Sequence, residues 1–188
     1  MLSEGDFALL ELPAEKTGFI SCDIFSESNG EVYFVYDEVL NNNDVLPYSP
    51  GNETTNLLPV SFKEGWHHFD SLEPMSFKYL KILSVSGEIK LSNLSVIAYE
   101  NPLIDTAEFT CDDKEINLIW NAAVNTFAQN AVDLFTDCPS RERAGWLCDS
   151  FFTGRVEKDL TGKNDIEHDF LQNFLIATDI CLLYTSPS

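Results

Sequence analysis

Positive charge is scarce in this chain. Its 188 residues include 11 Lys and Arg against 31 Asp and Glu, which gives a formal net charge of -20 at pH 7. Nucleic acids and anionic membrane surfaces are bound through a basic footprint, so the composition disfavours both classes of partner. A neutral sugar is indifferent to such a field, and the simplest explanation of the acidity is solubility.

Long apolar runs and metal-binding spacings are also missing. No segment has the roughly 18 continuous apolar residues of a membrane helix, and the first residues do not resemble a signal peptide, which leaves the cellular location open. Cys138 and Cys148 do not have the spacing of a zinc site, and neither do His67, His68 and His168. We therefore expect free thiols, no metal and no cofactor.

The first hundred residues have the pattern of β-structure. Short runs of aromatic and β-branched residues alternate with turn signals such as those at residues 28–30 and 86–87. This spacing predicts an antiparallel β-sandwich over residues 1–103. The predicted strand runs are residues 7–12, 18–25, 31–36, 58–62, 65–69, 79–85 and 90–99.

A sandwich of this kind is itself able to bind sugar. Trp66, Tyr36 and Tyr48 carry rings that stack well on a pyranose face. For Tyr36 and Trp66, however, the favoured interpretation is packing in the core or at a strand edge, because both lie within strand runs. A carbohydrate-binding sandwich is therefore kept as the alternative function.

The pattern changes near residues 101–102, and three amphipathic helices are predicted beyond them. The first covers residues 112–127, with Thr110 or Asp112 as its N-terminal cap and Trp120 on its apolar face. The second and third cover residues 144–158 and 166–177. The other side chains expected to face the core are Ile116, Ile119, Ala123 and Phe127, then Leu147, Phe151, Phe152 and Val156, then Ile166, Phe170, Phe174 and Leu175.

Three carboxylates are concentrated between the first two predicted helices, in residues 137–149, together with two arginines. These carboxylates belong to Asp137, Glu142 and Asp149. Such a group is costly to hold together unless it serves a ligand, and surface ion pairs alone would not explain the Pro, Gly and Trp residues among the charges. Pro139 disfavours helix at the residue before it, which places the carboxylates on a loop.

This stretch, Asp-Cys-Pro-Ser-Arg-Glu-Arg-Ala-Gly-Trp-Leu-Cys-Asp, resembles the signature of the α-L-rhamnosidases of glycoside hydrolase family 78. The resemblance implies that Glu142 is the general acid and that Asp137 and Asp149 contact the sugar. Trp146 is either a further sugar contact or an anchor of the loop. Arg141 is counted with the substrate-binding residues, and we expect it, like its neighbour Arg143, to orient carboxylates by paired hydrogen bonds.

Two departures from the family pattern bear on substrate preference. Many members have an additional acidic residue before the glutamate, where this chain has Arg141 directly. Cys148 stands where a glycine is common. Both departures leave the three carboxylates in place.

The resemblance also implies a fold and a mechanism. We expect a multidomain chain, β then α: a jelly-roll-like sandwich (residues 1–103), then the first helices of an incomplete (α/α)6 barrel (residues 104–180). The family inverts configuration, so the acid must be protonated at the working pH and a base must activate water about 6.5–9.5 Å away. That base would come from a later helix, so we expect the chain alone to be inactive on its substrate, a rhamnosylated glycan or glycoside. A related six-hairpin hydrolase of another sugar stays open.

The last eight residues have a different character. Residues 181–188 resemble one reading frame of a transposon-based sequencing adapter. We therefore expect them to be an artefact, with the authentic sequence ending near Ile180, and exclude them from the fold.

Overall fold

The computed structural model describes residues 1–49, 53–102, 104 and 107–177. The chain divides into two compact units, residues 1–98 and 99–188, and each is described here by itself. The predicted boundary after residue 103 stays a prediction. Residues 181–188, including Cys181, lie outside the described part.

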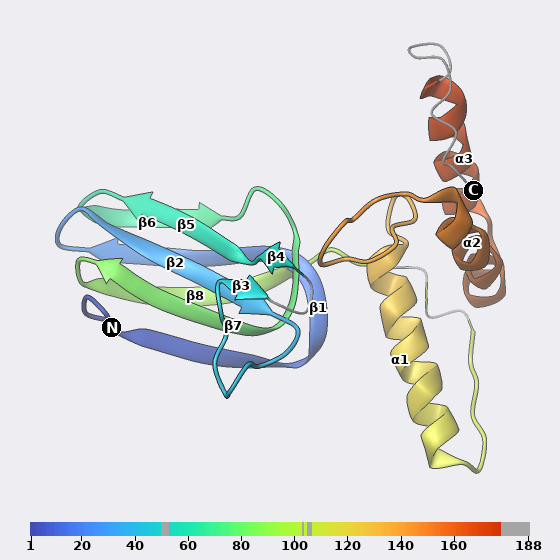
Figure 1. Cartoon of the computed structure of the whole chain (residues 1–188), viewed down its shortest axis with the longest axis horizontal. Helices are drawn as coiled ribbons and strands as arrows, with labels where there is room; N and C mark the ends of the chain where they lie inside the picture. Colours follow the sequence, from blue (N-terminus) through green and yellow to red (C-terminus); the bar gives the residue numbers. More distant parts are fainter. Residues whose placement is uncertain (50–52, 103, 105–106, 178–188) are drawn as a thin grey trace. The chain divides into compact units, whose positions relative to one another are not determined.

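The first unit is an antiparallel sheet that curls on itself (Figure 1). Its hydrogen-bonded order is β5-β2-β7-β1-β6, and β8 also pairs with β1. The strands are β1 (Phe7–Ser26), β2 (Gly30–Asp37), β5 (Leu57–Phe62), β6 (Gly65–Asp70), β7 (Met75–Ser86) and β8 (Ile89–Ala98), with β3 (Tyr48–Ser49) and β4 (Thr54–Thr55) forming a separate ribbon.

Strand β1 connects the two halves of the curled sheet. Its first part pairs with β7, with a register shift between Glu11 and Lys16. Its last residues lie between β6 and β8, because Asp23 pairs with a residue of each strand. Two predicted runs, residues 7–12 and 18–25, are therefore one continuous strand.

Alternation along the strands separates the core from the outer face. Ile20, Cys22 and Ile24 of β1 are buried, and Tyr36 packs against the same core, as predicted. Trp66 is 61% exposed and packs on Phe25 with ring centroids 5.0 Å apart, so it packs at the strand edge and not in the core. The reason is its register: Trp66, His68 and Asp70 lie on the exposed face of β6, while His67 and Phe69 alternate with them.

The second unit contains α1 (Lys114–Asn130), α2 (Leu147–Thr161) and α3 (Asp165–Ala177) (Figure 1). The N-terminal cap of α1 is Asp113, not Thr110 or Asp112 as predicted, because the Asp113 carboxylate accepts the N–H groups of Glu115 and Ile116. Helix α2 begins three residues later than predicted, since the backbone of Trp146 is extended. None of the helices in the described part is long and apolar enough to cross a membrane.

The small core of this unit includes Phe127, Phe135, Leu160 and Phe170. Much of the predicted apolar surface of the described residues lies outside it, as expected for the first helices of an incomplete barrel. The exposed side chains are Ile116 and Ile119 of α1, Leu147, Phe151, Phe152 and Val156 of α2, and Phe174 and Leu175 of α3.

A buried carboxylate explains which face of α2 turns inward. Glu157 is only 1% exposed, and its two oxygens accept the N–H groups of Ile166 and Glu167 at 2.9 Å each. These groups belong to the first turn of α3, which has no intrahelical acceptor for them. Burying Glu157 as a cap for α3 turns the opposite, apolar side of α2 to the surface.

Candidate active site

The signature stretch forms a loop that is closed at its base by two residues. The N–H of Asp137 donates to the carbonyl of Ala144 at 3.0 Å, and the N–H of Ala144 donates to Oδ1 of Asp137 at 2.8 Å. The other oxygen of Asp137 accepts from the Cys138 thiol at 3.1 Å. Asp137 therefore holds the loop together, whatever else it contacts.

Glu142 lies within this loop and receives two hydrogen bonds. Its Oε2 accepts from the indole Nε1 of Trp146 at 3.0 Å, and its Oε1 accepts from Nη2 of Arg141 at 2.5 Å. The Glu142 side chain is 39% exposed, so it is both fixed in direction and accessible from solvent. Arg141 thus donates one hydrogen bond to this carboxylate, and the paired hydrogen bonds expected of the two arginines stay a prediction.

The next residue, Arg143, turns the chain. Its φ of 50° lies in the left-handed region, which is uncommon for a residue with a side chain. This turn lets the chain reverse between Glu142 and Ala144, so that Ala144 returns to Asp137. A non-glycine residue in this conformation is typical of tightly constrained functional loops.

Gly145 lets the loop approach the helical core. A Cβ atom built on Gly145 would lie 2.7 Å from Cε2 of Phe170 and 3.3 Å from the carbonyl oxygen of Phe135. The first distance is too short for real atoms, so no larger residue fits without movement of the Phe170 ring. Phe170 itself packs against Phe135, with ring centroids 5.5 Å apart.

Asp149 lies in the first turn of α2 and is exposed. Within the described part of the chain its carboxylate makes no hydrogen bond or ion pair, although its carbonyl accepts from Thr153. The structure thus joins Glu142, Arg141 and Trp146 by direct bonds and closes the same loop through Asp137. Asp149 is close to these residues in the sequence, but its carboxylate is bonded to none of them.

Two contributors to this region were not found from the sequence. Glu157 reads as a surface residue of an amphipathic helix, and Phe170 as an ordinary core residue. The only available signal was Gly145, because a glycine between Ala144 and Trp146 indicates a close backbone approach. The sequence does not say what the glycine approaches.

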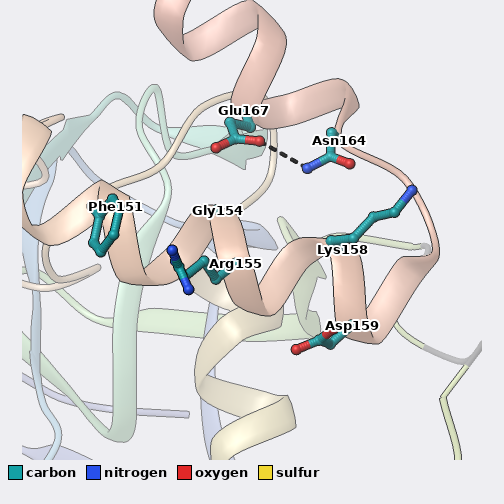
Figure 2. A pocket seen from close by; sticks show the side chains of 7 residues that line it. All are labelled: Phe151, Gly154, Arg155, Lys158, Asp159, Asn164 and Glu167. Carbon is teal, nitrogen blue, oxygen red and sulfur yellow. Dashed lines mark hydrogen bonds between the residues drawn. The ribbon is translucent and has the colours of Figure 1, made fainter.

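A surface pocket of the second unit lies elsewhere (Figure 2). It contains none of the predicted site residues. Two of the residues that line it are hydrogen-bonded, since the Asn164 amide donates to Glu167 at 2.8 Å. Its lining comes from α2 and the start of α3: Phe151, Gly154, Arg155, Lys158, Asp159, Asn164 and Glu167. We therefore do not identify it with the signature site.

The cysteines and histidines form no metal centre in the described residues, where no group of three or more His, Cys, Asp or Glu side chains is placed to hold an ion. Cys22, Cys111, Cys138 and Cys148 are free thiols, as predicted. Burial raises the pKa of Cys22 to about 12, so this thiol is unreactive at neutral pH.

The family model of the bacterial α-L-rhamnosidase six-hairpin glycosidase domain matches residues 104–177. The helical part of the chain is thus similar to the start of this glycosidase domain. The resemblance seen in the signature is therefore confirmed, and so is a β domain followed by the first helices of a six-hairpin glycosidase domain.

Comparisons with individual proteins also point to α-L-rhamnosidases. A curated α-L-rhamnosidase of Formosa agariphila is 23% identical over 157 residues, which cover 79% of this chain and 16% of that protein. A family 78 rhamnosidase structure from Bacillus sp. GL1 has a TM-score of 0.77 at 22% identity, over 85% of this chain and 17% of that one.

A rhamnosidase structure from Klebsiella oxytoca with rhamnose bound has a TM-score of 0.70 at 18% identity, over 88% of this chain and 35% of that one. These structures show the fold. The chain spans well under half the length of the relatives it matches.

Proposed function

We propose that this chain is the part of an α-L-rhamnosidase that supplies the general acid, and that the acid is Glu142. The observation that carries the proposal is the fixed, solvent-accessible carboxylate of Glu142, bonded to Trp146 and Arg141. It lies in the segment that matches the rhamnosidase domain. The relative from Klebsiella oxytoca holds rhamnose, which supports the choice of sugar.

In the proposed reaction, the protonated Glu142 gives its proton to the glycosidic oxygen as the bond from that oxygen to the anomeric carbon breaks. A water molecule forms the new bond on the opposite face of the sugar and loses its own proton to a base. After the transfer, Glu142 is a carboxylate. Both of its neighbours, Trp146 and Arg141, are hydrogen-bond donors, so they are complementary to this product state.

The aspartates have different roles in this proposal. Asp149 has an unengaged carboxylate and contacts sugar hydroxyl groups as an acceptor. Asp137 uses one oxygen to close the loop and has only the other oxygen for the sugar. The base belongs to a part of the parent enzyme outside this chain, so the chain alone has no turnover.

The test uses the complete parent protein and methyl α-L-rhamnoside, whose departing oxygen is basic and needs the proton of the acid; released rhamnose is measured. Positioned general acids contribute about 10²- to 10⁴-fold to the rate, so we expect Glu142→Gln to lower kcat by a factor in this range. Glu115→Gln, in the first turn of α1, is the matched control and should keep full activity. Full turnover by the Glu142→Gln enzyme would remove the proposed acid, whereas turnover of a different glycoside by the wild-type enzyme would correct only the sugar.

A further inference from the structure

The outer face of β6, β1 and β8 gathers an exposed aromatic ring and a fixed polar network. Ile20, Cys22 and Ile24 of β1 point into the core, so Ser21, Asp23 and Phe25 lie on the opposite face. The cross-strand pairs bring residues of β6 and β8 alongside them. These pairs are Phe25 with Trp66 and Lys90, Asp23 with His68 and Ser92, and Ser21 with Asp70 and Ser95.

Trp66 supplies a flat apolar surface on this face. It packs on Phe25 with ring centroids 5.0 Å apart, yet it stays 61% exposed and takes no part in the hydrophobic core. Contact with Phe25 restricts the indole, so little side-chain entropy remains to be lost when a ligand stacks on it.

A polar network around His68 lies on the same face, two residues along β6 from Trp66. Nδ1 of His68 lies 2.7 Å from Oδ1 of Asp23, and its Nε2 lies 3.4 Å from Oδ2 of Asp70. The side-chain amide of Asn93 donates to the other oxygen of Asp23 at 2.7 Å. The network therefore holds acceptors and donors in fixed positions on an exposed surface.

The backbone of β8 is bent to place Asn93 in this network. The pairing of β8 with β1 shifts register between Ser21 and Asp23, and Asn93 has a φ of 52°. Leu91 and Leu94 both pack on the core, with two residues between them where regular alternation has one. Such a bulge redirects a side chain to the other face, and here it redirects the Asn93 amide toward Asp23.

From this arrangement we infer that the outer face of β6, β1 and β8 binds a neutral glycan. A pyranose has an apolar C–H face, which stacks on an aromatic ring, and hydroxyl groups, which both donate and accept hydrogen bonds. Trp66 and His68 are two residues apart on one strand, a separation of about 7 Å. One sugar ring is therefore able to stack on Trp66 and reach the His68 network with its hydroxyl groups.

The charge of this surface selects the class of glycan. Asp23 and Asp70 lie at its centre, and the chain carries a formal net charge of -20. Uronic acids and sulfated sugars would be repelled. The inference goes beyond the proposed function, because binding at this face requires neither Glu142 nor turnover.

The experiment titrates the 188-residue chain with L-rhamnose, cellohexaose, laminarihexaose and a tetramer of galacturonic acid, and records tryptophan fluorescence and calorimetry. We expect saturable binding of at least one neutral probe, with a Kd of about 1 mM. Trp66→Ala should raise that Kd about tenfold or more, and Asn93→Ala should also raise it. Phe7→Ala, an exposed aromatic side chain where β1 pairs with β7, is the matched control and should leave it unchanged.

Several results would overturn the inference: no saturable binding of any probe, unchanged affinity in Trp66→Ala, or preferential binding of the galacturonic acid tetramer. Because Trp66 is exposed, Trp66→Ala should unfold at nearly the wild-type temperature, and this separates loss of binding from loss of fold. A negative result here leaves the role of Glu142 untouched.

Discussion

The indole N–H of Trp146 donates to Oε2 of Glu142 at 3.0 Å. Trp146 occupies the N-cap position of α2, where its side chain makes no capping bond. The indole is therefore available to Glu142, and a hydrogen bond links the proposed acid to the residue at the N-terminal end of α2. The position of the carboxylate is thus set by a rigid element as well as by its loop.

Replacing Trp146 with Phe should remove this bond while keeping an aromatic ring. Hydrogen bonds to charged groups contribute about 1.5–3 kcal/mol, so we expect kcat of the parent enzyme to fall about tenfold or more. The thermal midpoint should change little, because the ring is not part of the helical core. An unchanged kcat would show that the indole does not position Glu142.

Gly145→Ala should destabilise the second unit. The new methyl group would overlap the ring of Phe170, and overpacking of this kind costs about 1–3 kcal/mol. Adding Phe170→Leu should recover part of the loss, since it removes the overlapping atoms. Urea denaturation measures both effects.

Gly154→Ala in α2 is the matched control for this change. Its Cβ would meet only the flexible carboxylate of Glu167, and alanine favours helix by about 1 kcal/mol over glycine. Equal destabilisation by both substitutions would contradict the specific fit of Gly145 against Phe170.

The sequence predicted the order of the two parts, the strand runs and the three helices, because periodicity depends on local residues. It could not choose among neighbouring caps: Thr110, Asp112 and Asp113 are all capable, and only the geometry shows that Asp113 caps α1. The start of α2 was misplaced because Ala144 and Gly145 carry no signal against helix as strong as Pro139.

Exposure was the least predictable property. An apolar stripe on α2 predicts burial, but which side is covered depends on distant partners, and Glu157 turns the other side inward. For Trp66 the sequence left core and strand-edge packing open, because its register on β6 decides its face. At the site, the sequence identified the carboxylates through their resemblance to a signature. It did not reveal that Asp137 closes the loop on Ala144.

Glu157→Ala should destabilise the helical unit by about 1–3 kcal/mol, because it leaves two N–H groups of α3 without an acceptor. Glu157→Gln keeps one acceptor oxygen, so it should destabilise the helical unit less than Glu157→Ala does. Amide hydrogen exchange at Ile166 and Glu167 should accelerate in Glu157→Ala, whereas Asp159→Asn on the same helix should leave it unchanged. Unaltered exchange in Glu157→Ala would refute the capping role.

The His68 network should make the stability of the first unit depend on pH. The hydrogen bond to Asp23, and then the charge of Asp70, raise the pKa of His68. Hydrogen bonds from His68 and Asn93 lower the pKa of Asp23. The His68 contribution is complete below its unfolded pKa of about 6.5 and is lost as pH rises through the folded pKa. The Asp23 contribution is present above about 3.9 and is lost as pH falls.

His68→Gln should therefore lower the thermal midpoint of this unit most at about pH 5, and the gap to wild type should narrow at about pH 9. Calorimetric scans at both pH values test this. Asp70→Asn should lower the thermal midpoint by less than His68→Gln does, with the same dependence on pH. A gap that is equal at the two pH values would show that His68 acts by packing alone.

The most direct test of the account is the dependence of the Glu142→Gln parent enzyme on the leaving group. A general acid matters most when the departing oxygen is basic, and little when it leaves readily as an anion. The account predicts that Glu142→Gln loses about 10²-fold or more on methyl α-L-rhamnoside but far less on 2,4-dinitrophenyl α-L-rhamnoside. Equal losses on the two substrates, or none on either, would contradict the assignment of Glu142 as the proton donor.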